Sequence, residues 1–310
     1  MKDKRLYIFF GYWIEYTLNP LYQYMKEQGY NCIEITPSNC IDMRKTLLKL
    51  NAKENIFITS AHVFIDNTSK KFNDTHLAAL EAIDILRPKK KIFYPHDFTD
   101  LLEEYGMPWL NSIFDLILFP IDGYAHLACN GKSVYNVGWI KKIKKTGNGE
   151  RFKVGHGIGE WGHHIKKGSE HIQNVFKKIW EQGVIVKSAN TRTWEEQKLF
   201  FEKNNVNYID SSRSIFDLID TCEIMLTNGI TSVNMESALS GRYTINMLDN
   251  IVPKEVHERF FKGVPNLKMM TIEDTAELLR AYYKGDFIPE QGEDILKPFD
   301  FKRAVELIIS

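Results

Sequence analysis

The 310-residue sequence has little or none of several features that mark particular protein classes. Every apolar stretch falls short of the roughly 20 residues that a helix needs to span a bilayer, so we expect no transmembrane segment. Forty basic residues balance forty acidic ones, and this neutrality predicts no nucleic-acid partner. Neither a repeat nor a low-complexity segment is found in the sequence, which argues against solenoid and disordered proteins.

Cysteine is scarce, and its spacing is uninformative. The four cysteines form no Cys-x-x-Cys pair, which predicts reduced thiols in a cytoplasmic protein. The charged start of the chain, followed by the apolar run Leu6–Ile14, is similar to the start of a signal peptide. That run contains five aromatic rings and Gly11 and has no small-residue cleavage site. These features favour a buried first strand instead.

Several signatures of catalysis and metal binding are missing. The sequence has no Asp-x-Asp pair that would hold a metal-bound diphosphate, and no Gly-x-Ser-x-Gly elbow. His126 stands where a P-loop at 126–133 would need its first glycine. Four histidines fall within 156–171, but their spacing fits no standard zinc site. We therefore expect neither a metal ion nor another cofactor.

Short apolar runs alternate with segments of helical periodicity, and the rhythm breaks once. The predicted strands are 6–10, 31–35, 55–59, 91–94, 116–119 and 133–137, then 152–154, 184–187, 206–209, 224–226 and 243–247. Strands separated by helices imply right-handed crossovers and parallel sheets. The lysine- and glycine-rich segment 141–151 has the composition of an exposed linker. The sequence thus predicts an α/β protein with two facing Rossmann-like domains and a cleft between them.

The expected domain boundaries follow from this break. Residues 1–146 form an acceptor-side domain, 147–283 form a nucleotide-donor-binding domain, and 284–310 form a tail whose helix packs back towards the first domain. Ligands of open parallel sheets sit beyond the carboxyl ends of the strands. The residues that follow each strand are therefore the candidates for a site.

The strongest candidate site follows the predicted strand 224–226. Asn228 begins a turn, and Thr231 or Ser232 can cap the helix that comes next. The N–H groups at such a helix start suit a phosphate. Glu236 lies one turn after Ser232 on the same face, where its carboxylate can accept hydrogen bonds from the hydroxyls of a ribose. The alternative is a capped, buried helix in which Glu236 has no ligand.

This segment resembles the donor-binding element of GT-B glycosyltransferases and their relatives. It is similar to the S-S-V-x-x-D-x-A-L-x-G-K-P pattern of teichoic-acid glycerophosphotransferases and to the E-A-x-x-x-G-x-P element of UDP-N-acetylglucosamine 2-epimerases. The matching residues are Thr231, Ser232, Val233, Glu236, Ala238, Leu239 and Gly241, while Arg242 and Tyr243 replace the usual Lys-Pro. The resemblance implies the GT-B architecture over the whole chain, with the donor on the second domain.

The segment after the predicted strand 91–94 supplies the candidate catalytic residues, His96 and Asp97. A neutral imidazole that is oriented by a carboxylate can take a proton from an acceptor hydroxyl near neutral pH. The glycerophosphotransferases carry W-H-G-T in a comparable place, and this segment is similar to it only in its histidine. The alternative is a loop histidine that caps the next helix.

Two further segments are candidates for contact with the donor phosphates. The glycine-rich segment 154–164 predicts a loop lining the cleft, in which Gly155, His156 and Gly157 approach the diphosphate; solvated loop histidines are the alternative. Lys187 ends a predicted strand, where GT-B proteins often place a basic residue on the phosphates. Plain solvation at the strand end is the alternative for Lys187.

The resemblance and the candidate residues together imply a metal-independent GT-B glycosyltransferase. It would move a sugar from a nucleotide-sugar donor to a hydroxyl acceptor, such as a glycan, a polyol or a lipid-linked saccharide, in bacterial or phage surface-glycan synthesis. In-line attack would invert the anomeric centre. Four alternatives stay open: a CDP-glycerol-type glycerophosphotransferase, a UDP-sugar 2-epimerase, a DNA-modifying glycosyltransferase, and a non-catalytic nucleotide- or glycan-binding module.

Overall fold

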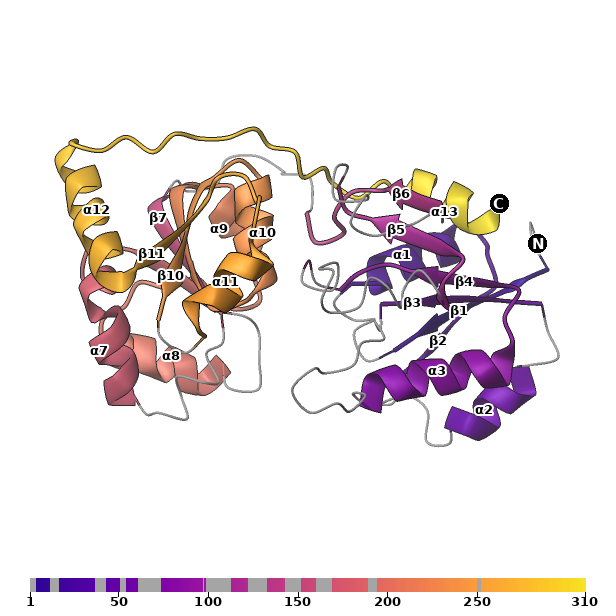
Figure 1. Ribbon diagram of the computed structural model, residues 1–310. Helices are drawn as coiled ribbons and strands as arrows, with labels where there is room; N and C mark the ends of the chain where they lie inside the picture. The colour runs from indigo at the N-terminus through magenta and orange to yellow at the C-terminus, as the bar shows by residue number, and fades with distance from the viewer. Residues whose placement is uncertain are drawn as a thin grey trace. The chain divides into compact units, whose positions relative to one another are not determined.

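In the computed structural model, the chain forms two compact units (Figure 1). Unit 1 comprises Met1–Ile143 and Lys297–Ser310, and unit 2 comprises Lys144–Leu296. The structure describes residues 4–11, 17–36, 43–50, 54–60, 74–96, 98, 113–121, 133–142, 152–159, 169–188, 194–249 and 252–310. A search of these described residues finds no helix long and apolar enough to cross a membrane.

Unit 1 contains a six-stranded parallel sheet in the order β2-β1-β3-β4-β5-β6. Its strands are β1 (Leu6–Phe10), β2 (Cys32–Ile35), β3 (Asn55–Thr59), β4 (Lys90–Phe93), β5 (Leu116–Phe119) and β6 (Ser133–Asn136). The helices within its described residues are α1 (Asn19–Glu27), α2 (Met43–Leu50), α3 (Asp74–Leu86) and α13 (Phe301–Ile309). Strands β1 and β3 are buried at every position, because central strands of a parallel sheet are covered on both faces.

Unit 2 contains a five-stranded parallel sheet in the order β11-β10-β9-β7-β8. Its strands are β7 (Phe152–Ile158), β8 (Ile185–Ser188), β9 (Cys222–Asn228), β10 (Tyr243–Leu248) and β11 (Leu267–Thr271). Its helices are α7 (Ser169–Trp180), α8 (Trp194–Lys203), α9 (Ile215–Ile219), α10 (Ser232–Leu239), α11 (Lys254–Phe260) and α12 (Ile272–Lys284). In place of the strand predicted at 206–209, Tyr208 forms a single bridge to Val186. The prediction of two parallel α/β sheets is confirmed.

The two faces of the unit 2 sheet are covered by different helices (Figure 1). Side chains of β7, β8, β9 and β10 pack with those of α7, α8 and α12 into one apolar core. Helices α9 and α10 cover the other face, where Leu218 and Val233 lie against β7. This face differs from the first because glycine occupies two of its β7 positions.

The glycines of β7 correct one expectation. Sequence analysis predicts a loop after residue 154, but the strand continues to Ile158. An added Cβ would lie 2.7 Å from the Cys222 sulfur at Gly155 and 2.7 Å from the Val233 side chain at Gly157. Contacts below 3 Å would force a shift. The missing side chains therefore allow α9 and α10 to pack closely on the sheet.

The C-terminal tail is joined to unit 1 by backbone hydrogen bonds. Trp139 N–H donates to the Lys297 carbonyl at 2.8 Å, and Asp300 N–H donates to the Val137 carbonyl at 2.7 Å. The Lys90 ammonium donates to a carbonyl in the last turn of α13 at 2.8 Å. Residues far apart in sequence thus form one unit.

Residues 285–296, which sequence analysis groups with the tail, run along unit 2 instead. Gly292 N–H donates to the Gly241 carbonyl at 2.8 Å, and the N–H groups of Ile295 and Leu296 both donate to the Leu239 carbonyl. The chain therefore leaves unit 2 only after Leu296.

Substitution of Gly138 tests the attachment of the C-terminal tail to unit 1. Its φ is +79°, and an added Cβ would lie 2.3 Å from the Pro298 carbonyl oxygen. Gly285 has a similar φ of +85°, but nothing lies within 4 Å of an added Cβ. Both alanine variants suffer the backbone strain of about 1–2 kcal/mol. We expect Gly138→Ala to lose about 1–3 kcal/mol more, because of the collision. Urea unfolding of both variants checks this, and equal losses would contradict the tail contact.

Candidate functional site

The carboxyl edge of the unit 2 sheet contains a reversal of strand order. From β7 the chain moves outward to β8, and from β9 it moves in the opposite direction to β10 and β11. Ligands of open α/β sheets bind at such a switch point. Gly159 follows β7, Asn228 ends β9, and Asp249 follows β10. These three residues therefore stand where a ligand of this sheet is expected.

The Asn228 side chain joins the three strand ends. Its Oδ1 accepts a hydrogen bond from Gly159 N–H at 3.0 Å, and its Nδ2 donates to the Gly159 carbonyl at 2.8 Å. The same Nδ2 donates to an Asp249 carboxylate oxygen at 3.1 Å. Asn228 is fully buried. One amide therefore fixes both polar backbone groups of Gly159 and one carboxylate, which sets the shape of this edge.

His156 supports Asn228 from inside the core. The Trp180 indole Nε1–H donates to His156 Nδ1 at 3.1 Å, and His156 Nε2 lies 3.2 Å from Asn228 Oδ1. An indole is only a donor, so Nδ1 is the acceptor and the neutral ring carries its hydrogen on Nε2, which donates to Asn228. The ring is fully buried and packs on Phe176. His156 therefore lies in the core, where its hydrogen bond orients the Asn228 amide.

A second group of buried side chains fixes the turn that follows β9. Gly229 has φ of +68°, a left-handed conformation that favours glycine. Its carbonyl accepts hydrogen bonds from Asn234 Nδ2 at 3.0 Å and Asn246 Nδ2 at 3.3 Å. The Thr227 hydroxyl donates to Asn234 Oδ1, and the Asn246 amide is hydrogen-bonded to His257 Nδ1 at 2.9 Å. The turn is thus rigidly placed before α10 begins.

The first turn of α10 has no side-chain cap within the described part of the chain. Thr231 is the N-cap residue, but its side chain makes no capping hydrogen bond, and no acidic residue lies in this turn. By contrast, Ser214 caps α9, Thr271 caps α12 and Asp300 caps α13. Among described N-cap residues with a side-chain oxygen, Thr231 is the exception. The first N–H groups of a helix need partners and attract anions.

Glu236 lies on α10, one turn beyond Ser232. It is only 1% exposed, and Ser232 is 7% exposed. A carboxylate is rarely buried to this extent unless other groups pair with it. Sequence analysis predicts that Glu236 binds a ribose; that role stays a prediction, and the structure adds that the side chain lies in an enclosed position.

Lys187 stands near the end of β8 and is 5% exposed. Its ammonium donates to the carbonyls of Ser188 at 3.3 Å and Ser211 at 3.2 Å. Burial lowers the pKa of Lys187, and the nearby Asp210 and Asp217 oppose this effect. An ammonium has three N–H donors, and its charge is incompletely compensated by two carbonyls. A phosphate near Lys187 would stabilise the charged form of its ammonium. Contact between Lys187 and the donor phosphates stays a prediction from the sequence.

The candidate base, His96, lies in unit 1, three residues beyond β4. Its side chain is partly buried in a bend at the carboxyl edge of the sheet. Asp97, its predicted partner, lies outside the described residues. The catalytic roles of both residues therefore stay predictions.

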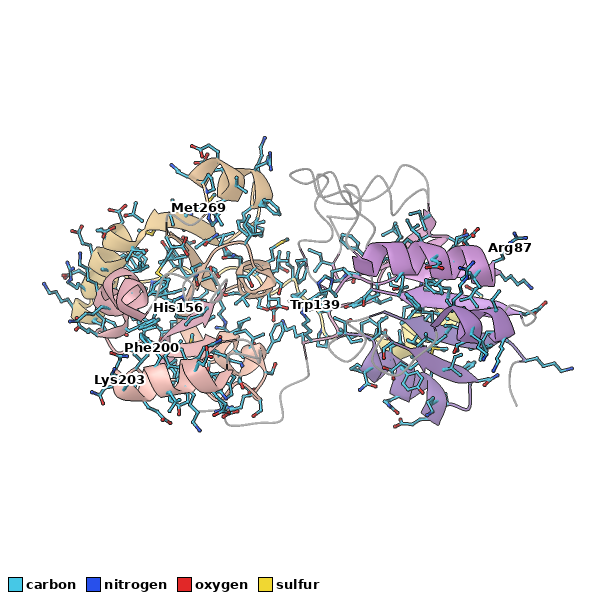
Figure 2. The ribbon with its side chains drawn as sticks, turned by 90° about the horizontal axis from the view of Figure 1, so that it is seen from below. Arg87, Trp139, His156, Phe200, Lys203 and Met269 are labelled. Atoms are coloured by element: carbon cyan, nitrogen blue, oxygen red, sulfur yellow. The ribbon has the colours of Figure 1, made fainter. Side chains whose placement is uncertain are left out.

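The segment that carries the candidate base is held from both sides. The Tyr94 hydroxyl donates to the Gly138 carbonyl at 3.0 Å and accepts a hydrogen bond from Ile140 N–H at 2.9 Å. Phe98 packs on Trp139 with ring centroids 4.4 Å apart, and Figure 2 labels Trp139 in unit 1. This anchoring fixes the backbone on each side of the candidate base, which a positioned acid–base group requires.

Comparison with known proteins identifies the fold. No family model and no curated protein matches the sequence. Similar solved structures include the UDP-GlcNAc 2-epimerase of Methanocaldococcus jannaschii in complex with UDP-GlcNAc and UDP, with a TM-score of 0.60 at 13% identity, covering 98% of this chain and 99% of that chain. The S. aureus MnaA–UDP structure gives 0.59 at 12%, covering 99% and 96%. The spinosyn rhamnosyltransferase SpnG with thymidine diphosphate gives 0.51 at 10%, covering 99% and 92%.

The chain has the GT-B fold. The similarity extends over nearly the whole chain, which confirms the architecture implied by the resemblance at residues 227–241. At identities of 10–13%, the similarity shows the fold alone. Within the described residues, no group of three or more His, Cys, Asp or Glu side chains is arranged to hold a metal ion.

Sequence analysis missed the polar side chains that build this edge. Trp180, Asn234, Asn246, Asp249 and His257 join Asn228 and His156 in hydrogen bonds at or behind the strand ends. The available signal was an amide within an apolar strand, as in the sequence YTINML of β10. Burying such an amide is costly without partners, so it indicates a polar network.

The role of the Asn228 amide can be tested by replacing it with the carboxylate of aspartate. Asn228→Asp removes two donors and places a new carboxylate beside Asp249 and the Gly159 carbonyl. We expect Asn228→Asp to lose about 3–5 kcal/mol of unfolding free energy, the usual cost of an unpaired buried charge. Asn228→Ala, which adds no charge, should lose about 1–3 kcal/mol.

Lowering the pH provides the control for this prediction. Acid neutralises the introduced carboxyl group and restores one donor, so the difference between Asn228→Asp and Asn228→Ala should shrink as the pH falls from 7 towards about 4. Chemical denaturation at several pH values measures it. A difference that stays constant with pH would show that charge repulsion at Asn228 is not the cause.

Proposed function

We propose that the protein is a glycosyltransferase that binds the nucleoside diphosphate of its sugar donor at the carboxyl edge of unit 2. The observation that carries this proposal is the first turn of α10, which follows the fixed turn at Gly229 and receives no capping hydrogen bond from the Thr231 side chain. The fold agrees with it. Of the solved structures with this fold, one contains both UDP-GlcNAc and UDP, a second contains UDP, and a third contains thymidine diphosphate.

In this proposal the α10 terminus binds the diphosphate. The N–H groups of Ser232 and Val233 donate to phosphate oxygens in place of a side-chain cap, and the helix dipole favours the anion by about 0.3–1 kcal/mol. Asn228 keeps the neighbouring Gly159 segment in place, while His156 holds Asn228 and makes no contact with the phosphates. Gly155 and Gly157 likewise act through helix packing. Lys187 supplies a positive charge to the diphosphate.

Glu236 binds the ribose of the donor in this proposal. Its carboxylate accepts hydrogen bonds from two ribose hydroxyls, and its enclosed position strengthens them because few waters compete. A carboxylate beside a phosphate would repel it, whereas a carboxylate one helical turn away serves a neutral polyol. The separation between Ser232 and Glu236 along α10 suits this division of roles.

The transfer step needs a base for the acceptor and a site that stabilises the leaving group. His96, oriented by Asp97, removes the proton from an acceptor hydroxyl as its oxygen attacks the anomeric carbon of the donor. The bond from that carbon to the diphosphate oxygen breaks, and the leaving diphosphate gains negative charge. The α10 N–H groups and Lys187 stabilise this charge without a metal ion. A single in-line displacement inverts the anomeric centre.

The ribose and phosphate roles can be separated by a crossed binding test. A thermal-shift screen of UDP, CDP, GDP and dTDP first identifies the nucleotide. Glu236→Gln should weaken both this diphosphate and its nucleoside by about 1–3 kcal/mol, since both carry the ribose. Lys187→Gln should weaken the diphosphate by a similar amount and leave the nucleoside unaffected. Titration calorimetry measures all four affinities.

A matched control accompanies this test. Glu277 lies exposed on α12, and Glu277→Gln should bind both ligands like the wild type. If Glu236→Gln also binds both ligands like the wild type, Glu236 does not hold the ribose. Equal weakening of the nucleoside and the diphosphate by Lys187→Gln would remove Lys187 from the phosphates.

His96 distinguishes an enzyme from a binding module. His96→Ala should lower turnover by about 10²–10⁴-fold, the usual contribution of a positioned acid or base. Donor affinity should stay unchanged, because the proton moves only in the transition state. In the wild type, turnover should rise with pH as the imidazole loses its proton. Full turnover in the variant would place the base elsewhere.

A UDP-sugar 2-epimerase is the second candidate. It is favoured by the Methanocaldococcus jannaschii UDP-GlcNAc 2-epimerase structure, which gives a TM-score of 0.60 with at least 98% of each chain covered. Incubation with the nucleotide sugar alone decides between the two, because an epimerase changes the sugar without an acceptor. Nucleotide binding without turnover for any donor and acceptor would favour a binding module. Turnover only with CDP-glycerol would favour the glycerophosphotransferase.

A further inference from the structure

Unit 2 contains a cavity of about 360 Å³ between the C-terminal halves of α7 and α8. Its volume falls in the range of small-molecule sites, which is about 300–1,000 Å³. The lining includes Lys177, Trp180, Phe200, Lys203, Asn204 and Asn205, and Figure 2 labels Phe200 and Lys203 in unit 2. Of these residues only Trp180 is connected to the nucleotide site proposed above, through its hydrogen bond to His156.

The cavity lies at the opposite edge of the sheet from that site. Helix α7 ends at Trp180, only a few residues before β8 begins at Ile185. Val206, which also lines the cavity, precedes the bridge between Tyr208 and Val186. These residues therefore stand at the amino edge of the sheet, whereas Asn228 stands at the carboxyl edge. A ligand in the cavity is thus separate from the donor.

The polar groups of the cavity suit a ligand with several hydroxyls. The Asn205 amide offers both donors and acceptors, Asn204 Nδ2 already donates to the Phe200 carbonyl at 2.7 Å, and the Glu181 carboxylate accepts hydrogen bonds only. Asn205 holds a left-handed conformation with φ of +52°, which asparagine tolerates better than most residues. Polar groups of both kinds around one cavity are the usual partners of hydroxyl groups, which both donate and accept.

Aromatic rings give the cavity an apolar side. Trp180 and Phe200 pack edge to face with centroids 6.2 Å apart. Phe200 is partly buried, and Trp180 is 7% exposed, so the Phe200 ring supplies most of the apolar contact. A pyranose has apolar C–H faces and a rim of hydroxyls. A cavity with aromatic rings on one side and amides on another matches that pattern.

The charges of the cavity favour an anion. Lys177 and Lys203 stand against one carboxylate, Glu181. The Lys177 ammonium lies 3.6 Å from a Glu181 carboxylate oxygen, but both side chains are more than 60% exposed. Ion pairs as exposed as this one contribute little to stability, so Glu181 does not hold Lys177 away from a ligand. The lining side chains therefore carry one net positive charge, which attracts a single anionic group. The C-terminal ends of α7 and α8 carry partial negative charge, which reduces this attraction.

We propose that this cavity binds a monosaccharide that carries one anionic group, either a carboxylate or a phosphate. The sugar ring packs on Phe200 and its hydroxyls bond to Asn204, Asn205 and Glu181. The anionic group lies between Lys177 and Lys203. This site is independent of the proposed transferase activity.

Titration calorimetry on the full chain tests the proposal with four probes: glucuronic acid, glucose 6-phosphate, glucose and inorganic phosphate. At least one of the two anionic sugars should bind about tenfold or more tightly than glucose, because the lysines add charge-assisted hydrogen bonds. Which of the two binds identifies the anionic group. Lys203→Gln and Lys177→Gln should each weaken that sugar about tenfold. Both lysines are exposed on helices, so their loss should leave the fold intact.

Two control variants locate the binding. Lys178→Gln changes the neighbouring exposed lysine of α7, which does not line the cavity, and should bind like the wild type. Glu236→Gln alters the proposed nucleotide site and should also bind the anionic sugar like the wild type. Loss of sugar binding in Glu236→Gln would place the sugar in the nucleotide site and overturn the proposal.

Three further results would overturn it. The first is the absence of binding by both anionic sugars at millimolar concentration. The second is phosphate binding as tightly as glucose 6-phosphate, which would show a simple anion site without sugar recognition. The third is an anionic sugar that binds equally well to the wild type, Lys203→Gln and Lys177→Gln, since the lysines would then have no part in it.

Discussion

The hydrogen bonds of the Asn228 amide are the constraint on which the carboxyl edge of unit 2 depends. Three strand ends meet at this switch point, and each brings polar backbone groups that cannot be left unpaired in a buried place. Asn228 satisfies both polar groups of Gly159 and donates to Asp249. Because one planar amide makes all three bonds, the relative positions of the strand ends are fixed together.

The orientation of that amide is fixed in turn by the core beneath it. The Trp180 indole can only donate, so it sets the tautomer of His156. His156 then presents a donor to Asn228 Oδ1, which leaves the amide nitrogen for Gly159 and Asp249. A chain of donors and acceptors with one direction thus runs from α7 through the sheet to its edge. Such networks specify a single arrangement when every member is satisfied.

Close packing on the other face of the sheet is the second constraint. Without side chains at Gly155 and Gly157, Leu218 and Val233 come within contact of the β7 backbone. This close approach seats α10 against the sheet, so that its first turn begins directly beyond β9. The position of helix α10 therefore depends on glycines roughly 75 residues earlier in the chain. We propose that the diphosphate binds at its N-terminal end, where the Thr231 side chain makes no capping hydrogen bond.

Local patterns in the sequence were enough to predict the fold class and most of the strands, although β11 was missed and the predicted strand 206–209 is only a single bridge. The bounds of β1, β3 and β5 agree with the predicted ones, because continuous apolar runs between turn residues identify buried parallel strands without any knowledge of neighbours. The turn at Asn228 and the start of α10 at Ser232 were also predicted. They depend on residues adjacent in sequence, and the resemblance to GT-B proteins rests on the same segment.

Only the tertiary structure decided which way the polar residues of these segments face. The glycines after residue 154 suggested a loop near phosphates, yet Gly155 and Gly157 lie in a strand, and His156 points to Trp180. Residues 285–296 run with unit 2 because their backbone bonds reach Gly241 and Leu239. The sequence by itself determined most of the elements, since periodicity is local. Side-chain direction was decided by partners that are distant in sequence, because burial selects whichever neighbour satisfies each polar group.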